Sequence, residues 1–465
     1  MSRTEKQFAP VLHKMQAHGL HPVVIANFRH YYERLVQGQT GVLPEADIQP
    51  VDGLEKMAAV ASDDVAETGR AHMDRTVMIK LNGGLGTSMG MQKAKSLLRV
   101  KDGLTFLDII VRQARHAAMP VVFMNSFSTR DDTREALAAY PHLERQAAPV
   151  DFLQHRIPKL AADGLGPATW PPNPALEWCP PGHGDIYPAL LTSGMLEALL
   201  EAGYVYAFVS NADNLGAVFD PALLGYFVQE NLAFMMEVAR RSKEDRKGGH
   251  LARLPSGRLV LREIAQTPEA DLDAFQDIRR HRWFNTNSVW IRLPDLKALM
   301  DRHGGVLGLP MIRNRKTLDP RDPDSPPVYQ LETAMGAAVS VFDKAGVIRV
   351  PRSRFAPVKT TNDLLAVRSD SYVLNDRWQL VPNPKRTLKP VRIKLDPAHY
   401  AFIDHFEKRF PHGVPSLLNC SSLTVDGDVR FGRGVTLSGG VALVNESRGP
   451  VEMPAMRSIE GTIRL

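Results

Sequence analysis

A short apolar run meets a glycine-rich loop in residues 77–90, Val77-Met78-Ile79-Lys80-Leu81-Asn82-Gly83-Gly84-Leu85-Gly86-Thr87-Ser88-Met89-Gly90. The apolar run predicts a buried strand. Glycines directly after a strand let backbone N–H groups approach a phosphate or a base, because no Cβ is in the way. Two common patterns are excluded: no register supplies a P-loop, and Met89 stands where a dinucleotide fingerprint needs glycine. A tight turn without a ligand is the alternative.

Helical and strand-like patterns alternate after this loop. Residues 105–117 and 195–200 predict helices, and residues 121–124 and 204–209 predict strands. Repetition of strand, helix and strand predicts an α/β domain with a largely parallel sheet that helices cover on both faces. Residues 1 to about 70 predict mostly helices that pack on this domain.

The last 75 residues or so have a six-residue apolar period with glycines in between. Two series of residues follow it: Leu423, Val429, Val435 and Val441, and Val425, Phe431, Leu437 and Leu443. This period is typical of a parallel β-helix. A pair of hairpins in a small sandwich is the alternative.

Composition limits the classes of function. The chain has 465 residues, 44% of them hydrophobic and 23% charged, which favours two or three globular domains over disorder. The net charge of +6 is spread along the chain, so we expect small phosphorylated ligands and no nucleic-acid partner. The two cysteines, the lack of a signal-like N-terminus and the lack of a long apolar run predict a cytoplasmic protein without a membrane span.

Two groups of residues near the loop suit an anionic ligand. Lys93 and Lys95 follow the glycines, where an ammonium group can neutralise phosphate charge. His183 stands between two glycines in residues 178–185, a poor position for a core side chain and a suitable one for a phosphate or hydroxyl ligand. Each of these residues taken alone is also compatible with an ordinary surface position.

Two later segments add a carboxylate and a third lysine. Asp213 lies in residues 210–214, at the end of a predicted strand, where it could hold Mg²⁺ on triphosphate oxygens. Residues 351–359 are basic, contain prolines and end in Lys359. No carboxylate pair, activated nucleophile or histidine cluster emerges, which favours phosphoryl or nucleotidyl transfer by positioning and charge neutralisation.

These segments together resemble a known family in the same order along the chain. They are residues 80–90, 180–185, 210–215, 284–287, 331–334 and 351–359, together with 102–108 and 263–266. The family is that of the eukaryotic-type UTP–glucose-1-phosphate uridylyltransferases. The resemblance implies a Rossmann-like nucleotidyltransferase domain of GT-A type with a mixed, largely parallel sheet at 75–388. It also implies a helical segment at 1–74 and a left-handed parallel β-helix at 389–465.

The resemblance also implies roles for individual residues. Uridine would contact Leu81, Asn82, Gly83 and Gly84, with Gln154 and Gly182 at the uracil ring. The sugar phosphate would contact His183, Asn211, Ala212 and Asn287. Asp213 would carry Mg²⁺, Lys95 would contact the UTP phosphates, and Lys359 would be catalytic. The implied reaction joins UTP and glucose 1-phosphate to give UDP-glucose and pyrophosphate, without a covalent enzyme intermediate.

Several alternatives stay open at this stage. The substrate could be another sugar 1-phosphate, such as N-acetylhexosamine 1-phosphate, and the chain could be a non-catalytic sensor or scaffold. A nicotinamide-dependent oxidoreductase is disfavoured by the missing fingerprint. Lys93-Ala94 stands where the family commonly has Gly-Pro, so Lys93 competes with Lys95 for its role, and Ser288 replaces a frequent Asn. The short C-terminal coils suggest pairing of two chains through residues 420–465.

Overall fold

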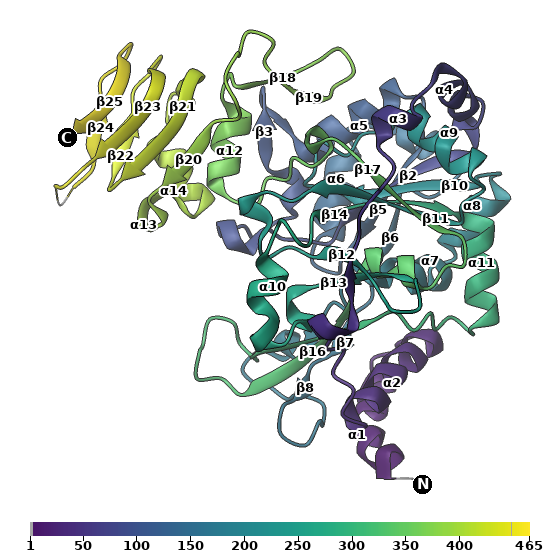
Figure 1. Cartoon of the computed structure of the whole chain (residues 1–465). Helices are drawn as coiled ribbons and strands as arrows, with labels where there is room; N and C mark the ends of the chain where they lie inside the picture. Colours follow the sequence, from purple (N-terminus) through teal and green to yellow (C-terminus); the bar gives the residue numbers. More distant parts are fainter. Residues whose placement is uncertain (1–2, 448) are drawn as a thin grey trace.

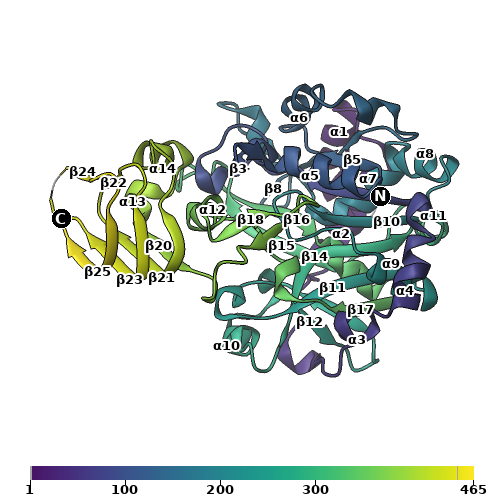
Figure 2. The ribbon, with the colours of Figure 1, turned by 90° about the horizontal axis from the view of Figure 1, so that it is seen from above.

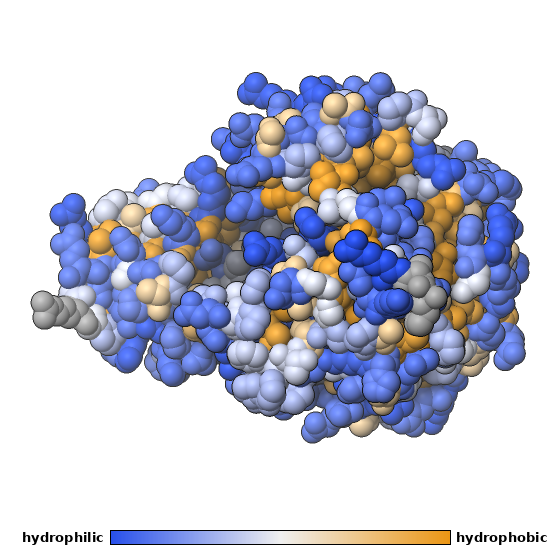
Figure 3. Space-filling model, turned by 90° about the horizontal axis from the view of Figure 1, so that it is seen from below, coloured by the Kyte–Doolittle hydropathy of each residue, from blue (hydrophilic) through white to orange (hydrophobic). Residues whose placement is uncertain are grey.

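The computed structural model describes residues 3–447 and 449–465. A central α/β part carries two N-terminal helices on one side, and the C-terminal strands project from it as a narrower arm (Figure 1). The face seen from below is mainly hydrophilic with interspersed apolar patches (Figure 3), as in ordinary globular proteins.

A 10-stranded sheet forms the centre of the molecule. Its main path runs through β1 (Gln49–Pro50), β12 (His250–Arg253), β14 (Trp283–Arg292), β10 (Tyr206–Asn211), β2 (Thr76–Asn82), β5 (Val121–Asn125) and β6 (Asp151–Leu153). Three further strands join beside this path: β11 (Phe234–Arg240), β13 (Leu259–Arg262) and β17 (Ala345–Arg349).

The sheet is mixed, and the prediction that it is largely parallel is wrong for one half. Strands β10, β2, β5 and β6 pair in parallel, as the alternating pattern predicts. Strand β14, however, runs antiparallel to β10, β11 and β12, and β12 runs antiparallel to β13. Only residues 254–258 join β12 to β13, and so short a connection can link only antiparallel strands.

Successive residues of each strand point to opposite faces, so the sheet separates two apolar cores. On β2, Met78 belongs to one core, whereas Val77 and Ile79 belong to the other. The first core packs against α5 (Phe106–His116), α9 (Pro221–Gln229) and α12 (Thr361–Arg368). The second packs against α7 (Ile186–Thr192), α8 (Met195–Glu201) and α11 (Leu293–Arg302). Helices on both faces of the sheet are thus confirmed.

Local signals set the ends of these elements. The predicted helix at 105–117 is α5, whose cap Thr105 forms a reciprocal capping box with Asp108. The strands predicted at 77–81 and 121–124 lie within β2 and β5. The strand predicted from residue 204 begins at Tyr206.

The N-terminal segment is mostly helical and packs on the central α/β part, and it also contributes one short strand. Helices α1 (Arg3–Ala17) and α2 (Pro22–Val36) bury Phe8 and Tyr32 in a core shared with a small sheet. That sheet has the order β15 (Met311–Thr317), β16 (Pro327–Thr333) and β8 (Leu160–Ala161). Helices α3 (Met57–Val60) and α4 (Asp63–Arg70) follow. Strand β1, which the sequence did not reveal, pairs with β12 and so extends the central sheet.

The C-terminal strands pair in parallel, which excludes the hairpin alternative. One sheet has the order β20 (Arg392–Leu395), β21 (Ser416–Asp426), β23 (Thr436–Val444) and β25 (Ser458–Arg464). A second consists of β22 (Val429–Phe431) and β24 (Val451–Met453). Leu423 lies opposite Val441, and 441 − 423 = 18 residues is three of the predicted six-residue periods. These strands lie beside α13 (Pro397–Tyr400) and α14 (Ile403–Arg409) (Figure 2).

The remaining elements are short. They are α6 (Arg130–Leu137), α10 (Leu272–Gln276), β3 (Arg99–Lys101), β4 (Leu104–Thr105), β7 (Ile157–Pro158), β9 (Trp178–Cys179), β18 (Tyr372–Leu374) and β19 (Leu380–Pro382). Cys179 and Cys420 are buried free thiols. Within residues 3–447 and 449–465, no helix has both the length and the apolar composition that crossing a bilayer requires.

Candidate active site

The glycine-rich loop and the polar segment 211–215 begin side by side. Strands β2 and β10 are parallel neighbours, and Leu81 lies opposite Asn211 in their register. The Ala212 N–H donates to the Leu81 carbonyl at 3.0 Å. Carboxyl ends of neighbouring parallel strands are where α/β sheets bind ligands. The two segments that the sequence nominated therefore meet at one edge of the sheet.

Gln154 joins the glycine loop to the segment that carries His183. Its Nε2 donates to the Gly182 carbonyl at 3.0 Å, and a Cβ added at Gly83 would lie 2.7 Å from its Oε1. Gly182 has φ +79°, and a Cβ there would lie 2.4 Å from the Thr333 carbonyl oxygen. Position 182 therefore requires glycine, whereas a side chain at position 83 would displace only the end of the Gln154 side chain. The structure brings together Gly83, which the resemblance places at uridine, and Gln154 and Gly182, which it places at the uracil ring.

Lys95, and not Lys93, reaches the predicted metal ligand. The backbone N–H of Lys95 donates to the Gly84 carbonyl at 3.0 Å, and its Nζ lies 2.7 Å from Asp213 Oδ2. Both side chains are largely buried, with 14% and 24% exposed. Lys93 is exposed. Of the two lysines, Lys95 is therefore the one with a side-chain contact to Asp213, and its role at the UTP phosphates stays a prediction.

Segment 351–359 is held against the Asp213 segment by backbone and amide bonds. Val358 N–H donates to the Asp213 carbonyl at 3.2 Å. Asn214 donates through Nδ2 to the Arg354 carbonyl at 3.1 Å and accepts from Ala356 N–H at 2.9 Å. These contacts place Lys359 directly after a chain segment that runs along the sheet edge.

A buried ion pair anchors the same segment. The Arg354 guanidinium donates two hydrogen bonds to the Glu237 carboxylate, at 2.7 and 2.8 Å. Trp290 Nε1 donates to the same carboxylate at 2.9 Å. Beyond the segment, the N–H groups of Lys359 and Thr360 donate to Asp363 Oδ2 at the start of α12. Lys359 is therefore an exposed side chain on a backbone fixed on both sides.

A cavity of about 300 Å³ collects Lys359, His183 and Asn287. Met335 N–H donates to His183 Nδ1 at 2.9 Å. Burial lowers the pKa of His183 to about 4, so the ring is neutral near pH 7. A neutral ring that accepts at Nδ1 carries its proton on Nε2. His183 is thereby a hydrogen-bond donor, which suits a phosphate or hydroxyl oxygen.

Glu263, Asn285 and Glu332 are three of the polar residues of this cavity to which the sequence assigned no role. Burial raises the pKa of Glu263 to about 7, and the positive charge of Lys359 acts in the opposite direction. Asn285 exchanges two hydrogen bonds with Asn287, at 2.8 and 3.0 Å, and supports its backbone at φ +56°. All three lie in segments that the sequence analysis singled out, namely 263–266, 284–287 and 331–334. Nothing in the sequence indicated that these three side chains line one cavity.

Comparison with known proteins assigns this site to a family. A sequence profile described as UTP–glucose-1-phosphate uridylyltransferase matches residues 25–438. The chain belongs to that family. The enzyme of that name from Solanum tuberosum is 39% identical over 446 residues, which cover 92% of this chain and 90% of the relative.

Solved structures agree with the family assignment. UDP-glucose pyrophosphorylase from Leishmania major, as a point mutant in complex with UDP-glucose, has a TM-score of 0.91 and 44% identity over 99% of both chains. The protein from Trypanosoma brucei has a TM-score of 0.89 and 44% identity, and it covers 99% of this chain and 100% of its own. This uridylyltransferase family thus matches the chain in sequence and in fold.

The Asn82 side chain, which the resemblance places at uridine, has hydrogen-bond partners of its own inside the protein. The Asn82 side chain is 2% exposed and donates to Asn125 Oδ1 at 2.8 Å and Thr133 Oγ1 at 2.9 Å. Asn82 therefore ties the loop base to β5 and α6, because its amide is already used in the core. Ala212 is 5% exposed and offers a ligand little beyond its backbone.

Lys80 is a buried charged residue that the sequence did not assign. Its Nζ donates to Ser210 Oγ at 2.7 Å and to the Ala217 carbonyl at 3.0 Å. Burial, and then the nearby charge of Arg354, lowers the pKa of Lys80 to about 7. Lys80 therefore ties β2 to β10 and to the turn behind the site in this uridylyltransferase-family chain.

Proposed function

We propose that this chain transfers the uridylyl group of UTP to glucose 1-phosphate and releases UDP-glucose and pyrophosphate. A sugar-phosphate oxygen attacks the α-phosphorus, a new P–O bond forms, and the bond from that phosphorus to the bridging oxygen of the pyrophosphate breaks. The nucleophile belongs to the substrate, so the protein needs to position two anions and neutralise their charge. The Lys95–Asp213 contact beside the Lys359 cavity carries this proposal.

The site residues divide between the two substrates in this proposal. Gln154 and the backbone at Gly83, Gly84 and Gly182 hold the uridine part, next to Leu81. Lys95 lies by the triphosphate. His183 donates from Nε2 to the sugar phosphate, and Asn211, Ala212 and Asn287 face the sugar side. Lys359 stabilises the charge that develops during transfer.

Asp213 fits a magnesium ion that the substrate would bring. Among the described residues, no three His, Cys, Asp or Glu side chains gather into a metal-holding cluster. Mg²⁺ is usually held by one or two carboxylates together with substrate phosphates, so a single aspartate suffices. Bound there by Asp213, Mg²⁺ would supply charge stabilisation on the phosphates.

Pyrophosphate release tests the proposal directly. The assay compares glucose 1-phosphate, galactose 1-phosphate and N-acetylglucosamine 1-phosphate with UTP and Mg²⁺. We expect a strong preference for glucose 1-phosphate. Preference for another sugar 1-phosphate would contradict glucose 1-phosphate as the substrate but would still support uridylyl transfer. UTP binding without release for any sugar would favour a sensor.

We also infer the domain boundaries of the chain. Residues 75–388 form the catalytic unit, with 1–74 packed on it, and the parallel strands of 389–465 form turns of a left-handed β-helix. The 18-residue spacing between residues 422–426 and 440–444 supports three six-residue sides in that turn, whereas β23 and β25 pair residues that are 20 or 22 apart. The free end of this arm suits pairing of two chains. A solution mass of one 51.6 kDa chain at micromolar concentration would contradict pairing.

A further inference from the structure

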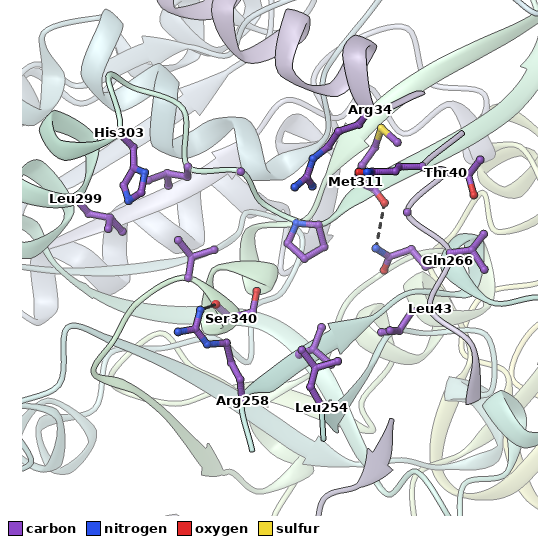
Figure 4. A pocket seen from close by; sticks show the side chains of 18 of the residues that line it. Arg34, Thr40, Leu43, Leu254, Arg258, Gln266, Leu299, His303, Met311 and Ser340 are labelled. Atoms are coloured by element: carbon purple, nitrogen blue, oxygen red, sulfur yellow. Dashed lines mark hydrogen bonds between the residues drawn. The ribbon is translucent and has the colours of Figure 1, made fainter. Parts of the chain in front are cut away.

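A second, larger cavity lies at the C-terminal end of α2, and none of the assigned site residues lines it. Its volume is about 890 Å³, against about 300 Å³ for the active-site cavity, and small-molecule sites typically span about 300–1,000 Å³. We call it the α2 cavity; its walls include Arg34, Leu43, Leu254, Arg258 and Met311 (Figure 4). Arg302 also lines it. The role proposed above for this chain uses none of these residues.

Positive charge dominates the α2 cavity. Arg34 extends into it from α2 and Arg258 from the β12–β13 hairpin, on opposite sides (Figure 4). Arg302 adds a third guanidinium, and Asp343 is the sole carboxylate that lines the cavity. Over residues 3–447 and 449–465, no carboxylate lies within 4 Å of these three arginines, and Arg258 donates to the Ser340 carbonyl at 2.9 Å. An anion would complete the charge balance.

Apart from the arginines and Asp343, the lining combines apolar side chains with polar residues, namely Gln39, Thr40, Gln266, His303 and Ser340. Leu43, Leu254, Val260 and Leu307 contribute to the walls. At the base, Gln266 is 3% exposed. We infer that the α2 cavity binds an organic anion, a small molecule with an apolar or aromatic body and a phosphate, carboxylate or sulfonate head.

The α2 cavity shares two walls with the active-site cavity. In the 263–266 turn, Glu263 lines the active site, whereas Gln266 lines the α2 cavity. On β15, Met311 faces the α2 cavity and Ile312 the active site, as alternate strand residues must.

Gln266 joins these walls through three hydrogen bonds. Its side chain donates to the Met311 carbonyl at 3.1 Å and accepts from Glu263 N–H at 2.9 Å. Its carbonyl accepts from Leu43 N–H at 2.7 Å. An anion that shifts the 38–43 segment therefore moves the turn that carries Glu263. We therefore infer that the two cavities are coupled, so that occupation of the α2 cavity changes the affinity for UDP-glucose. This part of the inference rests on the proposed function.

Fluorescence of 8-anilino-1-naphthalenesulfonate, an aromatic sulfonate, tests the binding site. We expect saturable binding of one molecule per chain, and at least about tenfold weaker binding in the double variant Arg34→Gln/Arg258→Gln. Arg377→Gln removes an exposed arginine elsewhere and should change the affinity less than twofold. Each variant must keep the wild-type melting temperature, because this dye also binds partly unfolded chains. Equal affinity in all three proteins would overturn the inference.

Competition identifies the head group. The competitors 1-naphthyl phosphate, 1-naphthoate and neutral 1-naphthol share one apolar body. We expect the phosphate or the carboxylate to displace the dye at least about tenfold better than the alcohol, and the stronger of the two names the head group. An alcohol as effective as both anions would contradict an anion site.

Titration with UDP-glucose tests the coupling separately. If the two ligands compete for one site, the apparent dissociation constant of the dye rises without limit as UDP-glucose increases. Coupling makes it level off at a new finite value, and the dye changes the UDP-glucose affinity by the same factor. No change, with UDP-glucose binding verified by calorimetry, would overturn the coupling. Lack of UDP-glucose binding would instead contradict the proposed function, which the dye experiment does not depend on.

Discussion

Lys95 Nζ and Asp213 Oδ2 lie 2.7 Å apart, although 118 residues separate them in the chain. The lysine follows the loop after β2, and the aspartate follows β10, the parallel neighbour of β2. The lysine that we propose for the phosphates and the aspartate that we propose for Mg²⁺ thus neutralise one another in the free protein. We expect the triphosphate and its Mg²⁺ to replace this ion pair when they bind.

Lys95→Met should lower turnover by roughly 10²–10³, the scale for loss of one group that stabilises transition-state charge. Lys93→Ala removes the exposed neighbour and should stay within about twofold of wild type. Steady-state rates of pyrophosphate release measure both. A larger loss in the Lys93 variant would reverse the assignment.

Lys359→Ala should also lower turnover by roughly 10²–10³ and leave UTP affinity nearly unchanged, because the lysine acts on developing charge. Lys385→Ala, which removes an exposed lysine, is the control. Turnover numbers and calorimetric dissociation constants are compared. Near-normal turnover in the Lys359→Ala variant would contradict the catalytic role of Lys359.

Asp213→Asn should raise the Mg²⁺ concentration that gives half-maximal activity by at least about tenfold, because an amide replaces the only protein carboxylate that we assign to the ion. Chelation of Mg²⁺ should abolish wild-type activity. Asp376→Asn, at an exposed aspartate, should leave the Mg²⁺ requirement unchanged. An unaltered Mg²⁺ requirement in the Asp213 variant would contradict its role.

Glu263 should make the protein less stable at higher pH. Its pKa rises from 4.5 in the unfolded chain to about 7 in the folded protein, so the folded state binds more protons between these values. Stability is therefore lost as pH rises from 4.5 through 7, by about 3 kcal/mol for this group. Urea unfolding at pH 5 and pH 8 measures the drop in the free energy of unfolding between these two pH values. That drop should be smaller in Glu263→Gln than in the wild type, by about 3 kcal/mol. An identical pH dependence in both proteins would exclude the effect.

Arg354→Met should destabilise the protein by about 3–5 kcal/mol, because it leaves the Glu237 carboxylate charged and buried without its partner. Arg352→Met is the matched control, since Arg352 is 42% exposed in its pair with Asp245 and should cost at most about 1 kcal/mol. Urea midpoints measure both. Equal losses of unfolding free energy in the two variants would mean that burial of the ion pair does not determine how much its removal destabilises the protein.

Local patterns in the sequence predicted much of the fold. The capping residues around α5, the apolar runs of β2 and β5 and the six-residue period of the C-terminal strands all depend on neighbours within a few residues. The antiparallel half of the sheet was missed, because the direction of β14 depends on partners far along the chain. Strand β1 is two residues long and leaves no periodic signal.

The sequence by itself determined the chemistry that is present: the glycines that permit close approach, three lysines and one aspartate that suit phosphate and Mg²⁺, and the family to which the chain belongs. Only the tertiary structure decided which of these groups meet. It placed Lys95, and not Lys93, against Asp213, paired the Asn82 side chain with Asn125, and brought Glu263 into the cavity with Lys359. The reason is physical: residue type and local pattern set what a side chain can do, whereas the long-range pairing of strands sets what it touches.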